Sequence, residues 1–544
     1  MKKLVLILVL GILIPNFALG QQARADLILF NGKVFTADPI HRNAQAIAIR
    51  GERIIAVGTT AEVRRLAGPG TRRIDLQGRV VIPGINDAHY HHTPDPPGHN
   101  LQFKSMEPSW QEVLDELRSA VKQTPKGTWI FGSIGLEVIT EPEATRFALD
   151  RIAPDHPVLL RTFYGHGYII NSRAMPKLLI KDEEPDPMGG YFERVSGSKR
   201  LTGKSFEYAD SLIARNLAGT VFPKETIESM RAFADEAVRY GITSVQNMSA
   251  LPVYRYLQLL VQARLPIRVR IIHHPQTSVK GRDLSDGIPF PLRPPSSPFI
   301  KVSGTKWILD GTPLERGAAL RASYRDQAGW SGRLNFSEAE VASMVKESLA
   351  RKDQLLVHCS GDKPVEVLFN AMDELRPTSD WPKMRVRIEH GDGVIGDLIP
   401  RARRLGVVVV QNPSHFTFTE IVQSRFGSDM PYFPLRSLVD AKIPVALGSD
   451  GPLNPYLNIM FAVIHPTRPT EALTREQAVE AYTLGSAFAE YAEQEKGSIK
   501  KGKLADIAVL SQDIFTVPVD ELPKTSSVLT IIGGKVVYDA GVLR

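Results

Sequence analysis

A chain of 544 residues is long for one simple domain, which predicts a large catalytic body with a smaller module. Hydrophobic residues make up 43% and charged residues 23%, as in ordinary globular proteins, and the net charge of +7 is spread without a long Lys/Arg block. A nucleic-acid footprint would concentrate such charge on one patch, so we expect no nucleic-acid partner. The one cysteine, Cys359, excludes an internal disulfide.

Residues 1–25 have the pattern of a signal peptide. Two lysines precede an apolar run from Leu4 to Ile14, and small residues follow near Gly20 and Ala25. The apolar run is too short for a comfortable membrane span. We therefore predict a periplasmic or secreted protein with no stable membrane anchor after cleavage, and an uncleaved anchor helix is the alternative.

The two ends of the mature chain are rich in short strands. Residues 26–82 contain apolar runs separated by hairpin-type turns such as Asn31-Gly32, but too few strands to complete a core. Residues 491–544 contain another strand and a final hairpin. We predict that the two segments pair into one small β-sandwich, into which the middle of the chain is inserted. An exposed edge of this sandwich could pair two chains into a homodimer.

The middle, residues 83–490, alternates strand-type and helix-type segments and so favours a parallel α/β fold. Eight candidate strands predict a (β/α)8 TIM-like barrel. The interval after the first strand is too long for one crossover, so we expect an inserted subdomain at about 95–235. The candidate strands are Ile82–His91, Gly241–Met248, Ile267–His273, Thr305–Asp310, Gln354–His358, Arg385–His390, Val407–Gln411 and Pro444–Asp450.

Ligand-type residues stand at the ends of four of these strands. His89 and His91 end the first strand, His358 and His390 end the fifth and sixth, and Asp450 ends the eighth. The carboxyl ends of barrel strands carry the chemistry in such folds. Any one histidine could be a satisfied core residue, but together they form a nitrogen and oxygen ligand set that suits zinc or a similar divalent ion.

A series of short motifs runs through nearly the whole mature chain in one order. It comprises Pro83–His91, Gly165-His166 with Asn171–Ala174, Gly241–Val245, Lys306–Gly311, His358–Asp362, Arg387–His390, Gly448–Asp450 and Gly497–Asp506. This order resembles the amidohydrolase superfamily, and within it the amidohydrolase-3 group, which includes the N-substituted formamide deformylases. The resemblance is specific for the superfamily and much less specific for the substrate.

The resemblance implies a two-metal site with zinc as the expected ion. His89, His91 and Asp450 would hold the more buried ion, and His358 and His390 would hold the second. The two ions would lie about 3.5–4 Å apart and share one hydroxide.

Lys306 matches the position of a carboxylated lysine that bridges the two ions. A carbamate turns a cationic amine into a bidentate anion, which suits this role. The alternative is an ordinary cation paired with a carboxylate such as Asp310, since lysine seldom stays buried without a partner. Lys301 is a nearby competitor that lacks the Asp-Gly context.

Asp450 would be both ligand and catalytic residue. It would take a proton from the attacking water as general base and pass it to the leaving amine as general acid. His166 would bind the substrate or the developing oxyanion, and a packing role in the inserted subdomain is the alternative. We expect His92 to face away from the site, Cys359 to be a small buried hydrophobe, and His415 not to be a ligand.

The main hypothesis is a metal-dependent hydrolase that cleaves a C–N amide-type bond of a small N-substituted amide or formamide by metal-activated hydroxide. A deaminase or a cyclic-amide hydrolase on the same scaffold is the first alternative. A non-catalytic periplasmic binding protein is the second, and it would require broken ligands, whereas all six proposed ligands are present.

Overall fold

The computed structural model describes residues 24–285, 297–375, 381–429 and 431–543. Nearly all of the predicted signal peptide lies outside these residues, so it stays a prediction. Within the described part of the chain, no helix is long and apolar enough to cross a membrane.

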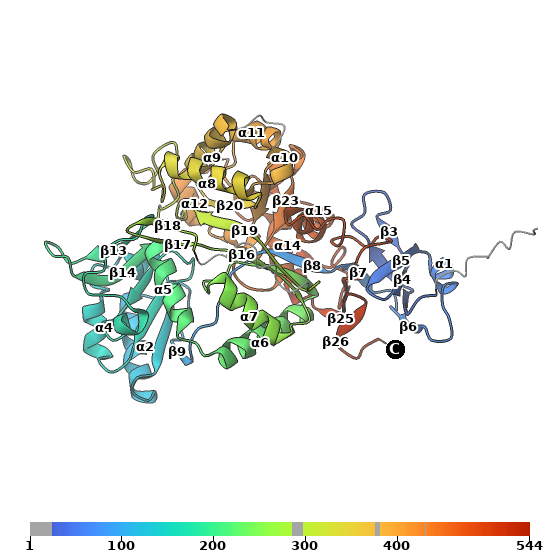
Figure 1. The fold of residues 1–544 in the computed structure, drawn as a ribbon, viewed down its shortest axis with the longest axis horizontal. Coiled ribbons are helices and arrows are strands. Elements are labelled where there is room, and N and C mark those ends of the chain that lie inside the picture. Colours follow the sequence, from blue (N-terminus) through green and yellow to red (C-terminus); the bar gives the residue numbers. More distant parts are fainter. Residues whose placement is uncertain (1–23, 286–296, 376–380, 430, 544) are drawn as a thin grey trace, which may run out of the picture.

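Eight parallel strands form the central sheet, and they confirm the predicted TIM-like barrel (Figure 1). Their order in the sheet follows their order in the chain, as right-handed β–α–β crossovers require. All eight overlap candidate strands, and the largest shift is at β19, which begins five residues before its candidate. They are β8 (Ile85–Tyr90), β15 (Ile242–Asn247), β16 (Arg268–His273), β19 (Ile300–Ile308), β20 (Leu355–Cys359), β21 (Arg387–His390), β22 (Val408–Gln411) and β23 (Val445–Leu447).

The barrel closes through hydrogen bonds between β8, its first strand, and the residues that follow β23, its last strand. Both backbone and side-chain groups take part. The N–H of Asp450 donates to the carbonyl of His89 at 3.0 Å. The carboxylate of Asp87 accepts hydrogen bonds from the backbone N–H of Ser449, at 3.1 Å, and from its hydroxyl. A Cβ on Gly448 would lie 2.5 Å from the backbone nitrogen of His89, so only glycine permits this approach. Closure therefore brings His89 and Asp450 together.

Helices cover the outside of the barrel. Their apolar faces pack on strands that are buried on both sides, as parallel sheets require. Ser337 caps one of them through its hydroxyl, as its sequence pattern predicts. The helices in this part of the chain are α6 (Pro223–Arg239), α7 (Val253–Ala263), α8 (Glu338–Arg351), α9 (Asp362–Leu375), α10 (Trp381–Met384), α11 (Leu398–Leu405), α12 (Thr419–Phe426), α13 (Leu435–Asp440), α14 (Pro455–Ile464), α15 (Arg475–Glu480) and α16 (Ser486–Ala489).

The first candidate strand, Ile82–His91, is divided at Gly84. The part before it, β7 (Val80–Pro83), belongs to a separate six-stranded sheet, and only β8 enters the barrel. A Cβ on Gly84 would lie 2.3 Å from the side chain of Thr243, so the chain passes too close to β15 for any larger residue. The apolar run continues through this point, so hydrophobicity alone does not reveal the break.

Strands from both chain ends form two sheets beside the barrel. Strand β24 pairs antiparallel with β7, which joins the C-terminal segment to the N-terminal one. Apolar side chains of both sheets, among them Leu29, Ile47, Val81 and Ile507, form one core. The four-stranded sheet has the order β5-β4-β1-β6, and the six-stranded sheet has the order β26-β25-β24-β7-β2-β3. The strands are β1 (Leu27–Phe30), β2 (Lys33–Phe35), β3 (Asn43–Ala44), β4 (Ala46–Arg50), β5 (Arg53–Gly58), β6 (Arg72–Asp75), β24 (Ile507–Leu510), β25 (Ser527–Ile532) and β26 (Lys535–Asp539), with helix α1 (Thr60–Arg64).

Between β8 and β15 the chain builds a further six-stranded sheet with cores of its own. Its strand order is β13-β14-β12-β11-β10-β9, and it lies at the opposite side of the barrel from the terminal sheets (Figure 1). Its elements are β9 (Gly98–Asn100), α2 (Trp110–Gln123), β10 (Trp129–Ile134), α3 (Leu136–Thr140), α4 (Arg146–Ile152), β11 (Val158–Thr162), β12 (Tyr168–Ile170), β13 (Gly190–Arg194), β14 (Leu201–Glu207) and α5 (Tyr208–Gly219).

Candidate metal centre

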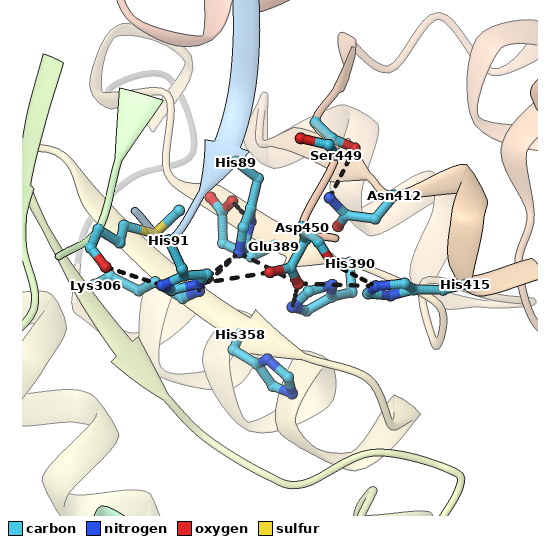
Figure 2. A network of polar contacts seen from close by, with 12 residues as sticks. His89, His91, Lys306, His358, Glu389, His390, Asn412, His415, Ser449 and Asp450 are labelled. Carbon is cyan, nitrogen blue, oxygen red and sulfur yellow. Dashed lines mark hydrogen bonds and ion pairs between the residues drawn. The ribbon is translucent and has the colours of Figure 1, made fainter. Parts of the chain in front are cut away.

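His89 and His91 at the end of β8 turn their Nε2 atoms toward each other, 3.1 Å apart (Figure 2). Nδ1 of His91 lies 2.9 Å from the carbonyl of Met248, and Nδ1 of His89 lies 2.6 Å from a carboxylate oxygen of Glu389. A carbonyl or carboxylate oxygen only accepts, so each Nδ1 carries the proton and each Nε2 keeps its lone pair. Two lone pairs aimed at one point are the arrangement that a metal ion requires.

Lys306, on β19, approaches the Nε2 atoms of both histidines from a second strand. Its Nζ lies 3.0 Å from Nε2 of His89 and 3.3 Å from Nε2 of His91, and its side chain is buried. Burial lowers its pKa to about 8, although the charges of Asp450 and Glu389 oppose the shift.

The two other residues considered with Lys306 have contacts of their own. Asp310 accepts the backbone N–H groups of Ala319, Ser360 and Gly361, and within the described part of the chain it makes no hydrogen bond or ion pair with a lysine. Lys301, the competing lysine on the same strand, donates to the carbonyl of Glu490 at 2.7 Å. Lys306 is therefore the lysine that meets the two histidines.

Asp450 follows β23 and brings a carboxylate to the same place. Its Oδ2 lies 3.6 Å from Nε2 of His89, and its Oδ1 lies 3.7 Å from Nε2 of His91. Burial would raise the pKa of this carboxyl, but its electrostatic interactions with His89, His91, His415 and Lys306 outweigh burial and hold the pKa well below the usual range. His89, His91 and Asp450 therefore form a group whose atoms and charge fit one divalent ion.

A second group shares Asp450. His390, at the end of β21, has its Nε2 3.8 Å from Oδ2 of Asp450, and Nε2 of His415 lies 3.9 Å from the same oxygen. The rings of His390 and His415 stack with centroids 5.5 Å apart. His415 comes from the short 3₁₀ helix Pro413–Thr417, which follows β22. The ligand atoms of these three residues lie within 4.8 Å of one another, so His415 stands closer to the centre than the sequence led us to expect.

His358 lies beside this group and belongs to neither set of three among the described residues. Its ring is 4.4 Å from that of His390 between centroids. Its Nε2 is 3.3 Å from the carbonyl of Gly311, and this hydrogen bond puts the proton on Nε2 and the lone pair on Nδ1. His358 is thus oriented to offer Nδ1 as a ligand.

Behind His89 stands a buried ion pair whose role the sequence did not reveal. Arg387 donates to both carboxylate oxygens of Glu389, from Nε at 2.8 Å and from Nη2 at 3.0 Å, and neither side chain is exposed. The same Nη2 donates to the carbonyl of Ala88. The sequence signal for this role was the presence of Arg387 and Glu389 in one short buried strand. Charged residues are seldom buried unless they are paired, and such pairs often orient the ligands of a site.

Three residues of this region hold a positive φ without being glycine. The φ angles are 64° for His390, 38° for Asp450 and 58° for Glu207. Such conformations cost about 1–3 kcal/mol each and persist where the surrounding structure holds a functional group in place.

His166 reaches the centre from the loop between β11 and β12. Its Nδ1 lies 2.8 Å from Oε1 of Glu207, and its ring lies 5.2 Å from that of His358 between centroids. Burial would lower its pKa, but the negative charges of Glu207 and Glu315 outweigh burial and raise the pKa to about 9. The predicted substrate-binding residue is therefore next to the predicted ligands, although it belongs to a different sheet.

Two further histidines near the centre, His92 and His274, and Cys359 have no proposed role as ligands. His92 faces away, with its ring 4.7 Å from that of Phe233 and its Nε2 3.3 Å from the hydroxyl of Ser229. Cys359 is buried beneath His358, and burial raises the pKa of its thiol well above its usual range. The ring of His274 is 6.4 Å from that of His91 and lines the same region.

Comparisons with known proteins agree with this geometry. The model of the amidohydrolase family matches residues 72–538. The N-substituted formamide deformylase of Arthrobacter pascens is 26% identical, over 94% of this chain and 98% of its own. Uncharacterized metal-dependent hydrolases of Pyrococcus furiosus and Pyrococcus horikoshii have similar folds, with TM-scores of 0.67 and 0.69 at 23% and 19% identity. They cover 90% and 91% of this chain and 100% and 99% of their own.

The family match spans most of the chain, including the barrel, the C-terminal strands and every candidate ligand, and it begins at β6. Nothing in these comparisons supports the alternative of a non-catalytic binding protein. The chain belongs to the amidohydrolase family, and it is a hydrolase that acts on carbon–nitrogen bonds.

Proposed function

We propose that this enzyme hydrolyses the C–N bond of a small N-substituted amide or formamide. One observation carries the proposal: the two Nε2 atoms of the His-x-His pair converge with a lysine and a carboxylate on one buried point. The formamide deformylase of Arthrobacter pascens resembles this chain over its full length, which supports an amide-type substrate.

The ligands would divide between two divalent ions, for which zinc suits the nitrogen and oxygen donors. His89, His91 and Asp450 would hold the first ion. His358, through Nδ1, and His390 would hold the second. We prefer His358 to His415 here because Nε2 of His415 also lies 3.3 Å from the carbonyl of Asp450, which engages its proton there.

Lys306 would bridge the two ions as a carbamate. An amine reacts with carbon dioxide only when it is neutral, and a pKa of about 8 leaves an appreciable neutral fraction near pH 7. The product is an anion with two oxygens, which compensates the charge of two cations in a buried place. The contacts of its Nζ with His89 and His91, two proposed ligands of the first ion, support this role.

Bound ions would supply Lewis-acid chemistry, lowering the pKa of water from about 15.7 to about 7 and polarising the amide carbonyl. The residues of the chain do the rest. The carboxylate of Asp450, ionised at neutral pH, accepts a proton from the attacking water at Oδ1 or Oδ2. It then donates this proton to the leaving nitrogen, which must be protonated before the amine departs. The positive φ of Asp450 holds the carboxylate over the site during both transfers.

The test combines metal analysis with a substrate panel. We expect two ions per chain by elemental analysis, a mass increase of one carbon dioxide on the fragment that carries Lys306, and hydrolysis of N-substituted amides or formamides. A chelator should abolish this activity, and zinc should restore it. One ion with an unmodified Lys306 and hydrolysis of amidines or cyclic amides instead would favour the deaminase or cyclic-amide alternative. Wild-type protein with full metal that cleaves nothing in the panel would refute the proposal.

Several further assignments accompany this function. We propose that residues 95–235 form an inserted subdomain that covers the site, since His166 and Glu207 come from it. The two terminal sheets share one core and would act as a β-sandwich module. On the pattern of residues 1–25 we propose export to the periplasm or medium. The expected partner is a small amide, with no nucleic acid, and pairing of two chains through the sandwich edge is testable by light scattering.

A further inference from the structure

Besides Arg387 and Glu389, a second buried pair of charged groups approaches the centre: His166 and Glu207. The side chains are 11% and 9% exposed. We propose that Glu207 is a positioning residue, which holds His166 so that its Nε2 hydrogen-bonds to the carbonyl oxygen of the amide substrate. This inference rests on the proposed function and adds the group that recognises the scissile carbonyl.

The carboxylate of Glu207 links the ring to the barrel wall. Its Oε1 accepts from Nδ1 of His166 at 2.8 Å, and its Oε2 accepts from Nδ2 of Asn335 at 2.8 Å. The same Nδ2 lies 3.2 Å from the carbonyl of Ile308, at the end of β19. The hydroxyl of Tyr208, the next residue after Glu207, accepts from the N–H of Ile308 at 3.0 Å. These contacts fix the orientation of His166 relative to β19. Ile308, where they end, is two residues after Lys306 on that strand.

Nε2 is the ring atom left for a ligand. It has no hydrogen-bond partner among the residues that the structure describes, while Nδ1 is engaged by Glu207. The ring lies 5.2 Å from that of His358, a proposed ligand of the second ion. Glu315 also lies within 4.8 Å of the pair, measured between possible ligand atoms. Two carboxylates around one imidazole favour its doubly protonated form, in which Nε2 is a donor.

The backbone of Glu207 argues against a purely structural salt bridge. Its φ of 58° and ψ of −123° lie in a region that glycine occupies readily and other residues avoid. The opposite strand runs close to this turn, since a Cβ on Gly190 would lie 2.3 Å from the backbone nitrogen of Ala209. On the other side, a Cβ on Gly311 would lie 2.9 Å from Oε1 of Glu207, so glycine leaves the room that the carboxylate fills. A glutamate at a position that suits glycine indicates that its side chain is needed.

A double-mutant cycle tests the proposal. We expect Glu207→Gln to lower kcat about 10–100-fold and His166→Ala to lower it about 100–1,000-fold with smaller changes in KM, since a donor to a developing oxyanion acts mainly in the transition state. The variant that combines both changes should be no slower than His166→Ala, because Glu207 acts only through His166. Effects that multiply would overturn the proposal.

Two further variants separate positioning from folding. Glu207→Gly loses the same ion pair as Glu207→Gln but relieves the strained backbone, so we expect a higher Tm than that of Glu207→Gln together with the same activity loss; retained activity would overturn the proposal. Glu193→Gln changes a glutamate of the same sheet, whose carboxylate accepts from the hydroxyl of Thr202, and it should leave kcat unchanged. Metal content is measured in every variant, because the loss must occur with both ions bound. A wild-type enzyme that cleaves no amide refutes the proposed function itself, whereas an active wild type with multiplying effects refutes only the role of Glu207.

Discussion

Oε2 of Glu389 lies 2.6 Å from Nδ1 of His89, and neither side chain is exposed to solvent. The glutamate is itself held by Arg387, so three residues form a chain from a buried cation to a proposed metal ligand. This chain fixes the tautomer of His89 and the direction of its Nε2 lone pair. The hydrogen bond from Nδ1 to the carboxylate of Glu389 also makes Nε2 of His89 more basic, and therefore a stronger metal ligand.

Replacing Glu389 should therefore weaken metal binding without touching a ligand. We expect Glu389→Gln to reduce the affinity for the first ion about 10–100-fold, measured by competition with a chelator. The free energy of unfolding should also fall by about 3–5 kcal/mol, because Arg387 is left buried without its partner. Adding Arg387→Gln removes the stranded charge, so the stability should partly recover while the affinity stays low. Wild-type affinity in Glu389→Gln would contradict this role.

Lys306 offers a test that depends on pH. Its pKa of about 8 means that the neutral amine, the form that reacts with carbon dioxide, increases as the pH rises through 8. Reactivation of apoenzyme by zinc and bicarbonate should become faster over this range, after correction for dissolved carbon dioxide. Lys306→Met should abolish the bicarbonate dependence and lose at least one ion. Lys301→Met is the matched control on the same strand, because Lys301 contacts Glu490 instead of the histidines, and it should keep both properties.

The assignment of the second ion can be decided by two alanine variants. His358→Ala should lose one ion per chain, because its Nδ1 is the proposed ligand. His415→Ala should keep both ions, since its Nε2 is 3.3 Å from the carbonyl of Asp450 and its side chain is one-third exposed. Elemental analysis after gel filtration measures the stoichiometry. The opposite pattern would assign the second ion to His390, His415 and Asp450, the group whose atoms converge in the structure.

The pair of His166 and Glu207 should make stability depend on pH. The pKa of His166 is about 9 in the folded protein and about 6.5 in the unfolded chain, so folding favours the protonated ring. The resulting stabilisation, about 3 kcal/mol, is fully present below pH 6.5 and is lost as the pH rises through 9. The difference in Tm between wild type and Glu207→Gln should accordingly be large at pH 6 and shrink toward pH 9. A difference that does not change between these values would contradict the raised pKa.

Much of the barrel could be predicted because its signals are local. Its strands alternate with helices along the chain, and the predicted histidine and aspartate ligands stand near the ends of strands, so the positions of His358 and Asp450 at one end of the barrel follow from the fold. The division of the first strand at Gly84 could not be predicted, because it depends on a close approach to Thr243, 159 residues later in the chain. Contacts of this kind leave no periodic pattern.

The residues that the sequence missed share another property. Glu207 lies 41 positions after His166 and approaches it through a strained turn that composition does not reveal. His415 sits in a 3₁₀ helix after the seventh strand, and the sequence did not show how near it lies to Asp450. Glu389 stood inside a recognised motif, but its role depends on which neighbour its carboxylate meets across the barrel. Ligands at strand ends can be predicted from the sequence, whereas the groups that orient them require the three-dimensional structure.

The junction of Asp87 with Ser449 joins residues 362 positions apart in the chain. During synthesis His89 therefore emerges long before Asp450, and the first ion has no complete set of ligands until the last barrel strand has been made. With the proposed ligands, an incomplete chain would present these histidines to a metal ion without the carboxylate of Asp450. Closure of the barrel would then come before metal loading in the maturation of the enzyme.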